Sequence, residues 1–286
     1  MTQMPDKWKI VRNEKYALQT FKKLRWKGQI ACIHCGCVER ITTYSVATNG
    51  VKRYFCPHCT KTFTDLSGTL FSKTKIPLWK WIYVLITLLE STGSLSSAET
   101  ARMIQVSYPT AWRMMRKLRK ACHDEPFLRK LRGVVESDEA WFSHKGNQTV
   151  LLGMVERDGA LKMFPIQDRT VDSLCGPHKL HVEKGSMVCT DSHTGYNGLN
   201  YGDYIHHFVN HSIGEFAWNH IHSNTIEGVW SMLKGIIRTI HHGVSKKHFL
   251  GYCHLFTFMY SNRKKSIHEK FTLLFGKFCQ PRYCLY

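Results

Sequence analysis

Val134-Val135-Glu136-Ser137-Asp138-Glu139 is the stretch that decides the fold of this chain. Its β-branched start predicts a strand, and Asp138 stands where that strand ends. A second apolar run, Met187-Val188-Cys189-Thr190-Asp191, also ends on an aspartate. Two strand ends that each present a carboxylate indicate a domain of mixed strands and helices in which the two acids can converge on one point.

A third acid belongs to a helix predicted from Asn224 onward. At about 100° per residue, Glu227, Lys234 and Arg238 share one stripe of this helix. A separate apolar stripe predicts the core face: Ile226, Trp230, Leu233, Ile237 and Ile240. Glu227 is therefore presented beside a basic row and away from the core. The ordinary solvated face of an amphipathic helix is the alternative interpretation of the same pattern.

Asp138, Asp191 and Glu227 are the type of ligand that a hard cation requires. Mg²⁺ and Mn²⁺ bind through carboxylate oxygens. Two such ions, roughly 3.5–4 Å apart, can hold the attacking and leaving oxygens of a phosphodiester. Lys234 and Arg238 would then hold phosphates. The pattern predicts a metal site of the nuclease type.

The overall charge points to the same class of partner. The chain has 286 residues and a formal net charge of +19, which indicates a polyanion and first of all nucleic acid. No polybasic amphipathic anchor for an anionic membrane stands out. The polar start predicts no secretion signal, and the most apolar run, residues 78–89, is too short to span a bilayer. We expect a DNA-binding protein without membrane association.

Four of the eleven cysteines form two closely spaced pairs. Cys32 and Cys35 form the first, and Cys56 and Cys59 follow after 20 intervening residues. Two such pairs predict a zinc ribbon with four thiolate ligands, in which Zn²⁺ stabilises the small module directly. Cys37 is close enough in sequence to compete with Cys35. The other cysteines are scattered, which indicates a reducing compartment and no disulfide framework.

Residues 69–130 have the pattern of a mostly helical segment in which a turn joins two short helices. Ser96 is an expected N-cap of the first, where Glu99 could complete a capping box. The second, over residues 111–120, is strongly basic. The pair is typical of a helix-turn-helix, although a helical hairpin that only packs is the alternative. The candidate DNA contacts are Arg113, Arg116, Lys117 and Lys120.

From residue 131 onward the composition changes to strand-like runs. Strands are expected over residues 133–137, 150–155, 161–166 and 187–190. Asp158-Gly159 predicts a hairpin turn, and residues 177–184 a crossover helix. The chain is expected to be helical from residue 223 to roughly 261. This order is that of a mixed α/β domain.

Three parts are therefore expected in a multi-domain α/β protein. Residues 1–68 would form an N-terminal helix and the zinc ribbon. Residues 69–130 would form the DNA-binding segment that resembles a helix-turn-helix, and residues 131–286 the catalytic domain.

Together these motifs resemble the DDE-superfamily transposases of bacterial insertion sequences, and most closely the ISXO-type subgroup related to eukaryotic Merlin elements. The resemblance covers about residues 20–265. The residues that carry it are the ribbon with Lys61-Thr62-Phe63-Thr64 and Gly68-Thr69, then residues 136–139, 153–157, 190–191, 209–212, 222–234 and 260–263. The combination is far more specific than any one acidic residue.

The resemblance implies an RNase H-like catalytic core and Mg²⁺-dependent cutting and joining of element ends. It matches Asp138 and Asp191 to the first two metal-binding acids, and Lys234 to the basic residue after the third. Glu227 has the usual two-turn separation from Lys234. Some relatives carry Asn in this motif, which makes Asn224 the other candidate for the third position.

A carboxylate binds a divalent ion better than an amide, so Glu227 is the favoured third ligand. Glu136 and Glu139 are expected to be structural neighbours of the site rather than ligands.

The resemblance implies a DNA transposase that binds the terminal inverted repeats of its element and the target DNA, and acts as a homo-oligomer. One alternative is a domesticated, non-catalytic DNA-binding protein, and another is a structure-specific metal-dependent nuclease. The expected location is the cytoplasm, with the nucleoid, in a bacterium and the nucleus in a eukaryote. The sequence leaves the host open.

Overall fold

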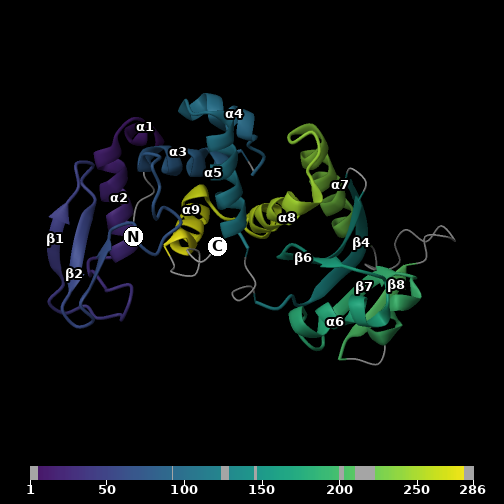
Figure 1. Cartoon of the computed structure of the whole chain (residues 1–286). Coiled ribbons are helices and arrows are strands. Elements are labelled where there is room, and N and C mark those ends of the chain that lie inside the picture. The colour runs from purple at the N-terminus through teal and green to yellow at the C-terminus, as the bar shows by residue number, and fades with distance from the viewer. Residues whose placement is uncertain are drawn as a thin grey trace. The chain divides into compact units, whose positions relative to one another are not determined.

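A computed structural model describes residues 6–91, 93–123, 129–144, 147–199, 203–209 and 223–279. The chain divides into two compact units, whose elements are labelled in Figure 1. The first unit combines residues 1–122 with residues 265–286, and the second spans residues 123–264. The C-terminal helix thus groups with the N-terminal elements, whereas the three-part division expected from the sequence remains a prediction.

The first unit holds a small antiparallel sheet and several helices. The sheet has the order β1-β2-β3, with strands Thr42–Val46, Lys52–Cys56 and Lys61–Thr64. The helices are α1 (Lys7–Ile10), α2 (Glu14–Trp26), α3 (Leu78–Glu90), α4 (Ser97–Ile104), α5 (Tyr108–Ala121) and α9 (Ile267–Phe278). α3 begins directly after Pro77, and β2 leads into Cys56.

Aromatic side chains explain why α9 joins this unit. Phe275 packs edge-on against Phe21 of α2, with ring centroids 5.5 Å apart. Phe278 packs in the same way against Phe71, at 6.0 Å. All four rings are buried, so moving α9 away from Phe21 and Phe71 would expose a large apolar surface.

Buried and half-buried acids connect the helices with the ribbon. The Asp65 carboxylate is fully buried and accepts hydrogen bonds from the Tyr54 hydroxyl at 2.9 Å and the Trp26 indole at 3.1 Å. Lys22 of α2 forms an ion pair with it at 3.0 Å. Glu14 of α2 accepts the first backbone N–H groups of α3, as a cap would. The ribbon and helices of this unit are therefore held by specific polar contacts.

The second unit is built on a five-stranded sheet in the order β6-β5-β4-β7-β8. The strands are β4 (Val134–His144), β5 (Asn147–Glu156), β6 (Leu161–Ile166), β7 (Met187–Asp191) and β8 (Ile205–Val209). β4, β5 and β6 pair antiparallel, whereas β7 pairs parallel with β4 and β8. The hairpin at Asp158-Gly159 is confirmed, with Asp158 at φ 58°. The mixed sheet is consistent with an RNase H-like core.

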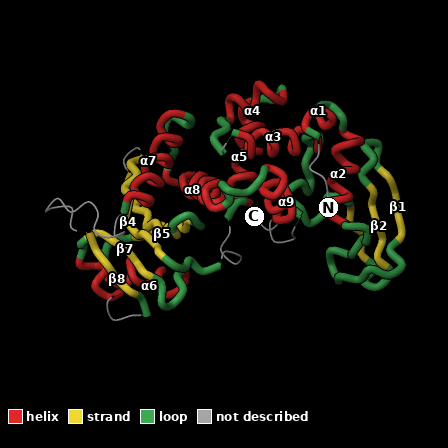
Figure 2. Tube along the Cα trace, turned by 180° about the vertical axis from the view of Figure 1, so that it is seen from behind, coloured by secondary structure: helices red, strands yellow, loops and turns green. Residues whose placement is uncertain are grey.

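Helices cover both faces of this sheet, and Figure 2 shows the helices and strands in contrasting colours. On one face, α7 (Asn224–Thr239) and α8 (Lys246–Ser261) bury an apolar cluster with Phe142 and Leu151. On the other, α6 (Val171–His181) and the 3-10 helix η1 (Thr194–Leu199) pack against Val135 and Leu152. The alternation of buried residues along β4 and β5 thus supplies two cores.

The crossover helix differs from the expectation. It begins at Val171 and ends at His181, so Pro177 lies inside the helix instead of opening it. The Thr170 side chain accepts the Ser173 backbone N–H and supplies the N-cap. A threonine cap thus outweighed the preference of proline for the first helical turn.

The helical C-terminal region is also divided. α7 ends at Thr239 and α8 begins at Lys246, with His242 and Gly243 at positive φ between them.

Across the described residues, the structure contains no helix that is both long and apolar enough to cross a membrane.

Candidate active site

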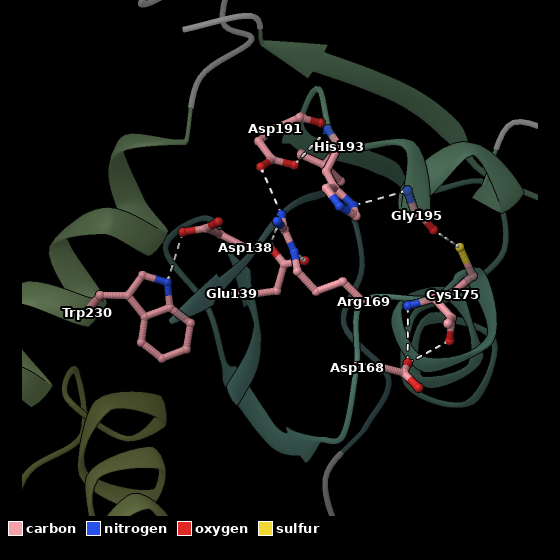
Figure 3. A network of polar contacts seen from close by, with 11 residues as sticks. Asp138, Glu139, Asp168, Arg169, Cys175, Asp191, His193, Gly195 and Trp230 are labelled. Atoms are coloured by element: carbon pink, nitrogen blue, oxygen red, sulfur yellow. Dashed lines mark hydrogen bonds and ion pairs between the residues drawn. The ribbon is translucent and has the colours of Figure 1, made fainter. Parts of the chain in front are cut away.

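Asp138, Glu139 and Asp191 form an acidic cluster in the second unit. One carboxylate oxygen from each lies within 4.8 Å of the others. Figure 3 shows the cluster together with Arg169 and Trp230. Oxygen ligands at this spacing match the donor set of a divalent hard cation. The structure thus brings together the two aspartates that the sequence singled out and adds a glutamate.

The presence of Glu139 follows from where the sheet ladder ends. β4 pairs with β7 only as far as Glu136, opposite Cys189. Beyond that point the edge of β4 is unpaired on the β7 side. Asp138 and Glu139 leave opposite faces of β4, and at an open edge both carboxylates can reach the same point. Glu139, which we expected to be a structural neighbour of the site, therefore joins Asp138 in the cluster.

Asp138 lies on the face of β4 that α7 covers. The Trp230 indole donates a hydrogen bond to its carboxylate at 3.1 Å. Burial raises the pKa of Asp138 to about 6, and the charges of Glu139 and Asp191 act in the same direction. A nearby cation would stabilise the charged form of this carboxylate.

Gly153, opposite Asp138 on β5, makes room for Trp230. A Cβ at this position would lie 2.5 Å from the Trp230 ring. The glycine therefore allows the indole to approach β5 and β4 closely enough to reach Asp138.

Arg169 bridges two of the three acids. Its guanidinium donates two hydrogen bonds to Glu139, at 3.0 and 3.3 Å, and one longer bond to Asp191 at 3.5 Å. The guanidinium also lies 5.3 Å from the centre of the Trp141 ring. Arg169 thus neutralises part of the cluster's negative charge.

The chain after β7 orients Asp191. The backbone N–H of His193 donates to the Asp191 carboxylate at 3.1 Å. The His193 ring then accepts the backbone N–H of Gly195 at 3.1 Å. This turn holds the carboxylate at the end of the strand, while the imidazole points toward Gly195 (Figure 3).

Glu136 is structural, as expected. Its carboxylate is fully buried and accepts the backbone N–H groups of Thr225 at 2.8 Å and Ile226 at 3.1 Å. Arg157 forms an ion pair with it at 2.6 Å. A negative charge at a helix N-terminus is stabilised by the unpaired N–H groups there. Glu136 therefore fixes the start of α7 against β4.

The other expected site residues of α7 lie on its exposed side. Glu227 is exposed and accepts a hydrogen bond from the Ser223 hydroxyl at 2.7 Å. Asn224, Lys234 and Arg238 are exposed as well. Within the described residues, the grouped metal-ligand atoms of the acidic cluster do not include Glu227. Its role as third ligand, and that of Asn224, stays a prediction.

The four predicted zinc ligands converge in the ribbon. The sulfurs of Cys32, Cys35, Cys56 and Cys59 lie within 4.8 Å of one another. The Cys32–Cys59 and Cys35–Cys56 sulfur distances are 3.6 and 3.7 Å. Four thiolates around one tetrahedral zinc stand about 3.8 Å apart, so the geometry fits.

Cys37 is not a member of this group. Its thiol points to the backbone carbonyl of Glu39 at 3.7 Å.

The expected recognition helix has a basic outer face. Arg113, Arg116, Lys117 and Lys120 are all exposed on α5. The preceding helix, α4, is capped by Ser96, whose hydroxyl accepts the Glu99 N–H at 3.1 Å. Residues 105–107 join the two helices. That the pair forms a helix-turn-helix, and that the four side chains contact DNA, stays a prediction.

Some motif residues cannot be placed. Asn210, His211, Ser212 and His222 lie outside the described residues. Sequence reasoning also missed Arg169 and His193. The position of His193, two residues after Asp191, was the one available signal, whereas Arg169 follows β6 without any motif.

Comparison with known proteins identifies two domains. Residues 130–261 match the ISXO2-like transposase domain, and residues 12–62 match the transposase zinc-ribbon domain. The chain is 27% identical over 273 residues to a Halobacterium salinarum protein described as an uncharacterized protein in transposable element ISH50. This match covers 85% of the chain and 90% of that protein.

Among solved structures, a chain of the simian T-cell lymphotropic virus intasome in complex with PP2A regulatory subunit B56 gamma is similar at 14% identity. The match covers 61% of this chain and 68% of that one, with a TM-score of 0.32. The two domain matches lie on the ribbon and on the unit that holds the acidic cluster, so the chain carries an ISXO2-like transposase domain preceded by a transposase zinc-ribbon domain.

Proposed function

We propose that this protein is a DNA transposase that binds the terminal inverted repeats of its element and catalyses metal-dependent strand cleavage and strand transfer. The observation that carries the proposal is the acidic cluster of Asp138, Glu139 and Asp191, whose oxygens lie within 4.8 Å inside the transposase domain. Isolated acids on a protein surface are common, but here three acids share one site, in which partial burial raises the pKa of Asp138 to about 6.

Mg²⁺ or Mn²⁺ is the proposed cofactor of this cluster, and Zn²⁺ that of the four cysteines. Bound at the acids, the divalent ions would activate the attacking oxygen and offset charge on the phosphate. Zn²⁺ would hold the ribbon together. Both proposals rest on donor chemistry, since the acids offer oxygens and the ribbon offers thiolates.

We assign the metal-binding and phosphate-binding roles to the following side chains. Asp138 and Asp191 would bind metal, and Glu227 would be the third ligand, with Asn224 as the alternative. Lys234 and Arg238 would bind phosphate oxygens, because both are exposed and cationic on α7. Positive charge at the phosphate favours the transition state, in which negative charge builds up on its oxygens.

DNA recognition would come from the N-terminal parts. We propose that residues 69–130 bind the element ends through the basic face of α5, next to a ribbon domain over residues 1–68 and a catalytic domain over residues 131–286. The partners would be double-stranded DNA of the element ends and of the target, bound by a homo-oligomer. The protein would act where that DNA is, in the nucleoid of a bacterium or the nucleus of a eukaryote.

A cleavage and joining assay tests the proposal. Purified protein is mixed with labelled DNA from both flanks of its own gene and a target plasmid, with Mg²⁺ or Mn²⁺. We expect cuts at matched inverted ends that leave 3′-hydroxyl groups, followed by joining to the target. Glu227→Gln and Asn224→Ala, made in parallel, would show which residue serves as the third ligand.

The same assay separates the alternatives. Binding to the ends without any cut under both metals would favour the non-catalytic DNA-binding protein. Cleavage of junctions without preference for the element's ends, and without joining, would favour the structure-specific nuclease. Either result would contradict the transposase.

A further inference from the structure

Arg169 contacts two of the three acids of the cluster, although it lies on a different part of the chain. It precedes α6, whereas Glu139 lies on β4 and Asp191 ends β7. Its two contacts with Glu139 form a fork of hydrogen bonds at 3.0 and 3.3 Å. A guanidinium in this bidentate geometry forms a strong, directional pair.

The contact with Asp191 is weaker and more accessible. At 3.5 Å it lies at the long limit of a hydrogen bond. The Asp191 side chain is 33% exposed, whereas that of Glu139 is 1% exposed. Of the two ion pairs, the one with Asp191 is therefore the easier to break.

The backbone of Arg169 is held in place from both sides. The Asp168 carboxylate accepts the N–H and the hydroxyl of Thr170, at 3.1 and 2.7 Å. On the other side, a Cβ on Gly195 would lie 2.5 Å from the Arg169 carbonyl oxygen. The turn that carries Arg169 is thus ordered by hydrogen bonds on one side and packs closely against Gly195 on the other.

We infer that Arg169 is the resident counter-ion of the acidic cluster: it anchors on Glu139 and competes with the divalent metal for Asp191. The inference rests on the proposed metal site and deepens it. Three carboxylates this close repel one another, and one guanidinium offsets part of that repulsion. A bound divalent cation would make the guanidinium's charge unfavourable at Asp191, so Arg169 would retain Glu139 and give up Asp191.

The test measures Mn²⁺ binding to the zinc-loaded full chain without DNA, from the loss of the free-ion EPR signal. Arg169→Gln removes the competing charge, so the dissociation constant should fall by roughly fivefold or more at low ionic strength. Arg169→Lys keeps a charge but loses the two-pronged pair with Glu139, so its dissociation constant should lie between those of wild type and Arg169→Gln. Lys179→Gln, which removes an exposed charge of α6 elsewhere in the same unit, is the matched control and should change little.

Unchanged or weaker Mn²⁺ binding by Arg169→Gln would overturn the inference while leaving the metal site intact. The Asp191→Asn variant distinguishes a failure of the Arg169 inference alone from a failure of the proposed metal site. If Asp191→Asn leaves Mn²⁺ binding unchanged, the metal does not bind at the cluster, and both proposals are overturned.

A second measurement works on the wild-type protein and does not depend on folding of a variant. In protein labelled with ¹⁵N-arginine, Mg²⁺ should shift the side-chain resonance of Arg169, which the Arg169→Lys spectrum identifies. Arg129, exposed and paired with Glu156, should not shift. An Arg169 resonance that stays fixed at saturating Mg²⁺ would contradict the competition.

Discussion

Three acids within four residues of β4 have three different environments. Glu136 is buried under the start of α7, Asp138 faces the Trp230 indole, and Glu139 pairs with Arg169. Residue type alone could not separate them, because all three are carboxylates in one short segment. Their environments follow from what contacts each side chain: the start of α7 contacts Glu136, Trp230 contacts Asp138 on the same face of the strand, and Arg169 contacts Glu139.

Glu136 gives the clearest prediction about stability. Glu136→Gln removes the charge that pairs with Arg157 and caps α7, so the free energy of unfolding of the second unit should fall by about 2–3 kcal/mol. Urea unfolding followed by tryptophan fluorescence measures this change. Glu183→Gln, at an exposed acid of the same unit, is the control. Equal unfolding midpoints for the two variants would show that Glu136 is not a structural anchor.

Buried histidines predict a pH dependence. Burial lowers the pKa of His178 to about 4, from an ordinary value of 6.5. Between these values the unfolded chain holds the proton and the folded chain does not, so stability falls as the pH drops from 7 to 5. His254 behaves in the same way.

Each histidine should contribute a loss on the order of 1 kcal/mol to the second unit between pH 7 and pH 5. Thermal unfolding at both pH values tests this, with His178→Gln expected to lose less stability than wild type on acidification. A wild-type midpoint that is unchanged or higher at pH 5 would rule out buried neutral histidines as the controlling groups.

At the scale of single elements, the ribbon allows a matched test of its proposed zinc. Cys56→Ser removes one of four converging sulfurs and should lower zinc content and unfold the module, because a structural site contributes folding energy directly. Cys37→Ser is the control, since its sulfur points to the Glu39 carbonyl. Elemental analysis should find about one zinc per chain in wild type and Cys37→Ser. Full zinc in Cys56→Ser would exclude the four-cysteine site.

The basic face of α5 predicts a salt effect. Lys117→Gln with Lys120→Gln should weaken DNA binding and lower the slope of log affinity against log salt by about 1–2, because each phosphate contact releases counterions. Lys15→Gln with Lys23→Gln on α2 removes the same net charge at exposed positions and serves as the control. Fluorescence anisotropy over a salt series measures both slopes. Identical slopes for the two double variants would exclude α5 as the DNA-contacting helix.

Residues that favour helix starts located most helices correctly, but they were ambiguous where two such residues lie close together in the sequence. Ser96 marked the start of α4 correctly. At α6 the proline at position 177 suggested a start, whereas Thr170, seven residues earlier, supplied the cap. Both residues favour helix N-termini, so sequence alone could not decide between them.

At the scale of the whole molecule, the sequence predicted the ribbon, the mixed sheet and two of the three clustered acids. It could not predict Glu139 or Arg169, because their positions depend on where the β4–β7 ladder ends and where α6 begins. Both boundaries depend on tertiary contacts, which the local sequence does not reveal. The grouping of α9 with the N-terminal unit likewise depends on long-range aromatic packing.

The central claim is that the acidic cluster carries out metal-dependent DNA strand cleavage, and it is most directly tested by Asp138→Asn and Asp191→Asn. DNA binding and Mg²⁺-dependent cleavage of the element's ends are measured for both variants, with Asp172→Asn, an exposed acid of α6, as the control. The account predicts binding near the wild-type level and cleavage reduced by about a hundredfold or more, since each variant removes a metal-binding charge. Mg²⁺-dependent cleavage by either variant at the wild-type rate would contradict it.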